Sequence, residues 1–166
     1  MDGPLPGNTS GTARLLLGAP SYAVGWQEPI YVPNPAPGAT WSHTVDGRFH
    51  ERLISARWSY AASAVVANRY PLLSLSDVNG TVILRVPVMQ TIVAGNNLAV
   101  NLWVYGSSQF GQNQAEQFNG LPDVLAPPGY TWTATTPGMD AGDVVSGVVL
   151  LVQRYPNDAA EIAANG

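Results

Sequence analysis

Short segments in which apolar and polar residues alternate recur along this chain. Between residues 98 and 104, apolar side chains occupy every second position, and Asn101 and Trp103 lie between them. The same period of two appears at residues 57–61, 72–76 and 130–135. Successive side chains of a strand point to opposite faces, so this pattern predicts strands with one buried face. Residues 144–155 are almost continuously Val and Leu, which predicts a strand covered on both faces.

Turn-forming residues separate these segments. The sequence DVNG at 77–80 lies between two apolar runs and predicts a β-hairpin, and AGNN at 94–97 predicts a second turn after a short strand. About seven or eight short strands with regular turn signals are typical of an antiparallel β-sandwich. No internal repeat or heptad pattern is present, which argues against a propeller, a solenoid or a coiled coil.

The predicted strands do not cover the whole chain. We expect residues 1–50 to form an extended N-terminal arm and a Pro-rich edge segment, because they are rich in Gly and Pro. Residues 51–155 form the predicted sandwich, and 156–166 a short C-terminal tail. Residues 106–120 are polar and predict a long loop of the kind that often contacts a partner.

Composition narrows the function. The 166 residues include no cysteine, which excludes disulfides and thiol chemistry, and the seven basic residues are all arginine. Net charge is -4, so we expect no nucleic-acid partner. Charged residues make up 11% of the chain, well below the average of about 25%, which suits a surface that is buried against neighbours. With no secretion signal and no apolar run of about 20 residues, we expect a soluble protein made in a cytoplasm.

Two groups of residues suggest metal binding. Asp140 and Asp143 flank a tight turn and could hold Ca²⁺, but the spacing is not that of a calcium loop, so we expect them to bond the local backbone. His43 and His50 lie on either side of Asp46-Gly47, a common hairpin turn, and such a hairpin could bring them onto adjacent strands. Two isolated histidines are a weak signal, and we predict no metal and no cofactor.

Nothing in the sequence indicates catalysis. The carboxylates available for hydrolysis show no pairing in their spacing, and no nucleophile motif accompanies the histidines. These carboxylates are Glu28, Glu51, Glu116 and Asp123. We therefore predict no catalytic residues and no enzyme activity.

Five tryptophans and seven tyrosines offer another kind of site. Exposed aromatic side chains in the Pro-rich segment could stack on a glycan, and a glycan-binding or host-adsorption module is the alternative function. Against this, we expect these aromatic residues at an interface or in the core rather than on a glycan platform. We expect Trp58, Trp103 and Trp132 in the core.

The order of turns and strands resembles a group of small virion-associated proteins of tailed bacteriophages. The segments that carry this resemblance are VANRYPL, DVNGTV, APPGY and TPGMDAGD, followed by an apolar strand that ends at Arg154. They cover roughly residues 53–155 and include no catalytic motif. The resemblance implies a jelly-roll-like β-sandwich that is a structural part of a virion. It implies a protein made in a bacterial host that decorates or cements the capsid, or that lies at the head–tail connection or on the tail. Of these we expect a capsid decoration or cement protein, with a tail or head-fibre component as the alternative.

The same resemblance implies the partners. We expect the chain to bind the major capsid protein and other virion subunits, and to form a homo-oligomer on the capsid surface, with a host glycan as a further candidate. Docking would bury neutral polar and apolar surface. The residues predicted to anchor these contacts are Trp26, Tyr31 and Trp41 in the arm, and Phe110 and Phe118 in the long loop.

Overall fold

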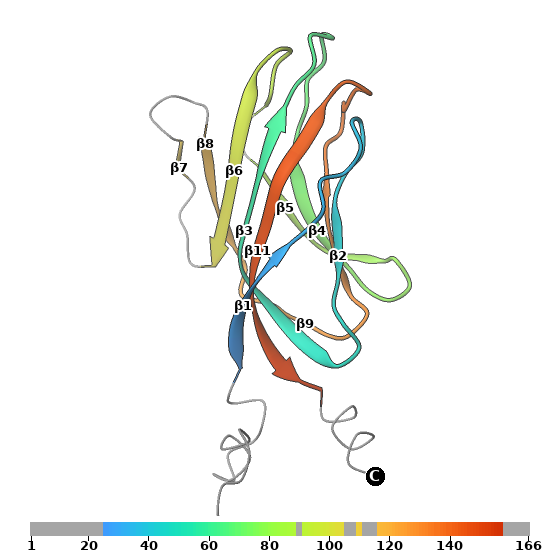
Figure 1. Cartoon of the computed structure of the whole chain (residues 1–166), viewed down its shortest axis with the longest axis vertical. Coiled ribbons are helices and arrows are strands. Elements are labelled where there is room, and N and C mark those ends of the chain that lie inside the picture. Colours follow the sequence, from blue (N-terminus) through green and yellow to red (C-terminus); the bar gives the residue numbers. More distant parts are fainter. Residues whose placement is uncertain (1–24, 89–90, 105–108, 111–115, 158–166) are drawn as a thin grey trace, which may run out of the picture.

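The computed structural model describes residues 25–88, 91–104, 109–110 and 116–157. All regular structure in these ranges is β-strand, and they contain no helix that could cross a bilayer. The strands form two sheets, which Figure 1 shows as two layers with β6, β3 and β11 side by side in one of them. The predicted antiparallel β-sandwich is therefore confirmed.

The larger sheet has the strand order β1-β11-β3-β6-β8-β7, and β9 pairs with β3 beside this path. Neighbouring strands are antiparallel except β6 and β8, which are parallel. The bounds are β1 Trp26–Tyr31, β3 Phe49–Ala61, β6 Asn97–Val104, β7 Gln109–Phe110, β8 Glu116–Leu121, β9 Leu125–Ala126 and β11 Val144–Pro156.

The smaller sheet has four antiparallel strands in the order β2-β10-β4-β5. Their bounds are β2 Ser42–Thr44, β4 Leu72–Ser76, β5 Val82–Pro87 and β10 Thr131–Thr135. The predicted DVNG hairpin joins β4 and β5. Asp77 stabilises its turn, because its Oδ1 accepts hydrogen bonds from the backbone N–H groups of Asn79, at 2.9 Å, and Thr81, at 2.8 Å.

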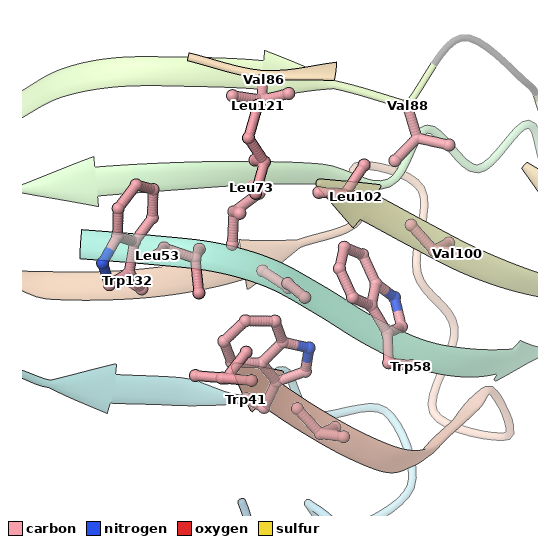
Figure 2. Packing of buried hydrophobic residues seen from close by; sticks show 14 of the residues in the cluster. Trp41, Leu53, Trp58, Leu73, Val86, Val88, Val100, Leu102, Leu121 and Trp132 are labelled. Atoms are coloured by element: carbon pink, nitrogen blue, oxygen red, sulfur yellow. The ribbon is translucent and has the colours of Figure 1, made fainter. Parts of the chain in front are cut away.

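The core fills the space between the two sheets (Figure 2). Its largest members are Trp41, Trp58 and Trp132, each at most 2% exposed. The rings of Trp41 and Trp58 meet edge to face with centroids 5.5 Å apart, a favoured aromatic geometry. Burial of these rings supplies much of the apolar surface that a sandwich of this size removes from water.

Alternation along the strands decides which residues reach the core. In β6, Leu98, Val100 and Leu102 are at most 2% exposed, as predicted, whereas Trp103 is 37% exposed. The prediction that Trp103 lies in the core is therefore wrong, because it shares the outward face of β6 with Asn101. The AGNN turn also forms no hairpin of two named strands. β6 pairs with β3 and β8, and Ile92 makes only an isolated bridge to Arg69.

Part of the segment predicted as an arm lies within the sandwich. Residues 26–31 form β1 at the edge of the larger sheet, and residues 42–44 form β2 at the edge of the smaller one. Proline at position 29 fits an edge strand, because it lacks an N–H to donate to a second neighbour. Residues 1–24 lie outside the described residues, as do 158–166 of the predicted tail, so an arm at 1–24 stays a prediction.

Candidate functional site: the loop end

Four connections between the sheets lie together at one end of the sandwich, at the top of Figure 1. They comprise residues 32–41, 62–71, 88–96 and 136–143, and we call them the loop end; residues 89–90 are outside the described part. Backbone hydrogen bonds join them, from the N–H of Gly38 to the carbonyl of Asp143 at 2.8 Å and from Gly95 to Ser63 at 2.8 Å. Backbone hydrogen bonds thus link the connections of the loop end to one another.

A buried ion pair lies beneath this surface. The guanidinium Nε of Arg69 donates to Oδ2 of Asp143 at 2.6 Å, and both side chains are 0% exposed. The other guanidinium nitrogens donate within the same loop, to the carbonyls of Val65 at 3.1 Å and Ala67 at 3.2 Å and to Ser63 Oγ at 3.0 Å. Arg69 therefore fixes the path of residues 63–69.

The carboxylate of Asp143 is fully satisfied. It accepts hydrogen bonds from the Tyr60 hydroxyl at 2.5 Å, from the backbone N–H of Ser63 at 2.7 Å and from that of Asp140 at 2.8 Å. Burial alone would raise the pKa of Asp143, but the hydrogen bonds from Arg69, Tyr60 and the backbone outweigh it and hold the pKa below its usual range. Burial, together with the bond to this carboxylate, raises the pKa of Tyr60.

The two aspartates of this turn therefore have structural partners. Asp140 accepts from the N–H of Gly142 at 2.9 Å and from Ser63 Oγ at 3.1 Å, the turn role that the sequence predicted. Asp143 does more, because its partners include a side chain 74 positions away. Within the described residues, no three His, Asp or Glu side chains are placed to hold a metal ion.

The exposed surface of the loop end is almost uncharged. Its four segments contain three charged residues, Arg69, Asp140 and Asp143, and the first and last neutralise each other in the interior. Apolar side chains project instead. Val66 is 92% exposed, Val65 54%, Val93 50% and Tyr70 47%. A neutral surface with projecting apolar groups loses little hydration energy when a partner covers it.

The opposite end of the sandwich carries ionic groups. Glu51 is 0% exposed and accepts hydrogen bonds from Nε of Arg154, at 2.8 Å, while its Oε2 lies 2.7 Å from Nε2 of His43. Arg154 also donates to Glu28 at 2.8 Å. Burial would raise the pKa of Glu51, but hydrogen bonds and charges from His43 and Arg154 prevail and lower it.

This cluster also revises the prediction for the two histidines. The Asp46-Gly47 turn joins β2 to β3, which belong to different sheets, so it does not place His43 and His50 on paired strands. His43 instead contacts a carboxylate of the other sheet. No sequence pattern indicated the Glu51–Arg154 pair, because 103 positions separate its members.

The predicted anchor residues lie in different surroundings. Trp26 is half-buried against Phe49, with ring centroids 5.3 Å apart, and Tyr31 is 74% exposed at the end of β1. Trp41 lies in the core at 2% exposure, so the folded chain does not offer it to a partner. Phe118 packs on Trp103 with centroids 5.1 Å apart, and Phe110 belongs to β7, its side chain lying outside the described part. Partner binding by the accessible residues stays a prediction.

Comparison with known proteins yields weak structural neighbours. No family model and no curated protein matches the chain. Among solved structures, a structure of the infectious bursal disease virus Gx strain has 14% identity and a TM-score of 0.32 over 86% of this chain and 43% of the other. The T13 particle of the same virus gives 16% and 0.29, over 86% and 42%. The chain thus spans less than half the length of these proteins, and neither belongs to a tailed bacteriophage.

Proposed function

We propose that this chain is a structural subunit of a virus particle, and specifically a decoration or cement subunit of a tailed-bacteriophage capsid. The observation that carries the proposal is the strand order. Four strands of one sheet run β1-β11-β3-β6, and the other sheet runs β2-β10-β4-β5. Among these eight strands, consecutive ones alternate between the sheets, except for the β4–β5 hairpin. This order matches the one expected for an eight-stranded jelly roll, an architecture found in viral capsid subunits as well as in lectin domains and cupins, and it supports the proposal.

The remaining strands fit this arrangement as an insertion. β7, β8 and β9 all lie in the connection between β6 and β10, and β8 extends the larger sheet beyond β6. An insertion of this kind leaves the eight-stranded framework unchanged. It widens one sheet, which adds lateral surface for contacts, and it places Leu121 and Ala126 in the core.

The surface chemistry supports a role in assembly. A subunit that stabilises a shell works by burying surface at many equivalent seams, and each stable seam typically buries about 1,600 Å². The loop end has an almost neutral surface on a rigid base, because the Arg69–Asp143 pair and its hydrogen bonds fix the loops beneath it. Such a surface docks with little loss of conformational entropy. The bacteriophage capsid assignment itself rests on the resemblance over residues 53–155.

A binding experiment tests this function. Purified chain is mixed with capsids that lack it, and co-sedimentation is measured together with the heat resistance of the capsids. We expect saturable binding and a higher disruption temperature. Val66→Asp should weaken binding about tenfold or more, because it places a charge on the neutral surface. Val78→Asp is the matched control, since Val78 is 66% exposed in the β4–β5 hairpin turn. Absence of binding by the unmodified chain would refute the proposal.

The alternative functions have less support. The predicted glycan platform consisted of Trp26, Tyr31 and Trp41 as exposed aromatic side chains. Tyr31 is exposed, but Trp41 is buried and the indole N–H of Trp26 donates to Glu28 at 3.2 Å. Three of the four carboxylates considered for hydrolysis are engaged with arginine: Glu28 and Glu51 with Arg154, and Asp123 with Arg52. We therefore propose neither a lectin nor an enzyme.

A further inference from the structure

The outer face of the larger sheet carries an ordered set of side chains that are exposed or half-buried. One row crosses five neighbouring strands at matched register, from β1 through β11, β3 and β6 to β8; its members are Tyr31, Val149, Arg57, Asn101 and Phe118. They face away from the core, because the residues that flank them along the strands, such as Val100, Leu102, Ala56 and Trp58, are at most 1% exposed. We infer that this face is the interface between two copies of this chain.

Charges on this face favour a second copy over another partner. Arg57 is exposed and forms no ion pair with any described residue, and Glu116 is exposed on the same face of β8. In the register of the sheet, Glu116 of β8 lies opposite Ala99 of β6, and Arg57 of β3 lies opposite Asn101 of β6. Ala99 and Asn101 are two positions apart along β6. The two charges are thus two strands and two residues apart, or about 12 Å on a regular sheet.

A twofold axis in the plane of the interface satisfies both charges at once. If the axis lies midway between Arg57 and Glu116 and perpendicular to the line that joins them, Arg57 of each copy meets Glu116 of the other. Such reciprocal contacts define a self-complementary interface. The axis then passes between Ala99 and Asn101, whose small side chains let the two sheets approach closely.

Aromatic contacts lie beside the same axis. Trp103 and Phe118 pack against each other on this face, and Trp103 keeps 37% of its surface exposed. Trp and Arg are the residues most enriched among those that dominate binding energy at interfaces. Trp103 and Arg57 thus give this face the residue types typical of the centre of an interface. The loop end lacks them, because its arginine, Arg69, is buried in the pair with Asp143.

Two of the sheet edges, β1 and β5, resist pairing with a second chain. β1 contains Pro29, and β5 ends at Pro87 and is irregular where its register against Leu75 and Ser76 shifts. Prolines and bulges at edge strands prevent a second chain from adding a strand. Self-association through these two edges is therefore disfavoured.

Charge reversal tests the inference on the purified chain alone, so its outcome is separate from that of the capsid experiment. Sedimentation equilibrium should show that the unmodified chain dimerises with a dissociation constant of about 1 mM or lower. Arg57→Glu or Glu116→Arg alone should raise the dissociation constant about tenfold or more, because each places like charges opposite each other. Arg85→Glu, an exposed arginine on β5 of the other sheet, is the matched control and should change nothing.

Complementation identifies the pair itself. Mixing the Arg57→Glu chain with the Glu116→Arg chain restores both opposite-charge contacts, so a heterodimer should form where neither variant forms a homodimer. The double variant should also dimerise again. A monomer at all concentrations, or a dimer that both reversals leave unchanged, would overturn the inference.

Discussion

The buried Arg69–Asp143 pair allows the strongest test of how the loop end is built. In Arg69→Met, the side chain keeps its approximate length but loses its charge, so the Asp143 carboxylate stays buried with three hydrogen bonds instead of four. Breaking a buried pair by removing one partner typically costs about 3 to 5 kcal/mol. In a chain of 166 residues, 1 kcal/mol corresponds to about 2–4 °C in melting temperature, so we expect a drop of about 6 to 20 °C.

The assay is thermal and urea unfolding followed by circular dichroism. Arg85→Met removes the same functional group from an exposed position on β5, and it should change the free energy of unfolding by no more than about 0.5 kcal/mol. Arg69→Met combined with Asp143→Asn should cost less than the sum of the two single variants, by about 0.5–3 kcal/mol, because the pair acts as a unit.

The reasoning fails if Arg69→Met and Arg85→Met lower stability equally. It also fails if the costs of Arg69→Met and Asp143→Asn simply add. Equal losses would mean that residues 62–71 hold their path without the guanidinium, whereas additive costs would mean that Arg69 and Asp143 stabilise the loop end independently.

Three further predictions concern stability. The pKa of Glu51 is lowered in the folded chain, so the ionised carboxylate contributes fully to the free energy of unfolding above its ordinary pKa of 4.5, and this contribution is lost as the pH falls below that value. Glu51→Gln should therefore flatten the decline of the urea midpoint measured between about pH 6 and pH 3. Gly138→Ala should destabilise more than Gly80→Ala, as calorimetry would show. Both glycines have a positive φ, +80° and +81°, but a Cβ at Gly138 would lie 2.3 Å from the carbonyl oxygen of Asn68, whereas Gly80 has open space. Trp58→Ala should cost about 3–5 kcal/mol in chemical unfolding, since it empties the contact with Trp41, and a loss below about 1 kcal/mol would contradict the core assignment.

The sequence alone supported the local elements. Alternation predicted the inward faces of β6 and β10, where Trp132 and Ala134 are buried, and DVNG predicted the β4–β5 turn. These predictions succeeded because they depend on side chains two to four positions apart, whose relation is fixed by strand geometry and turn chemistry.

Pairing between distant segments was decided only in the tertiary structure. Nothing near Trp41 distinguishes an exposed anchor from a core residue; the difference lies in β2 pairing with β10, which places Trp41 on Trp58. The Asp143 carboxylate likewise finds Arg69 only after the sheets close. Alternation with a period of two shows that a strand has two different faces. Which of these faces another sheet covers depends on contacts between residues that are scores of positions apart, and no short window of the sequence contains that information.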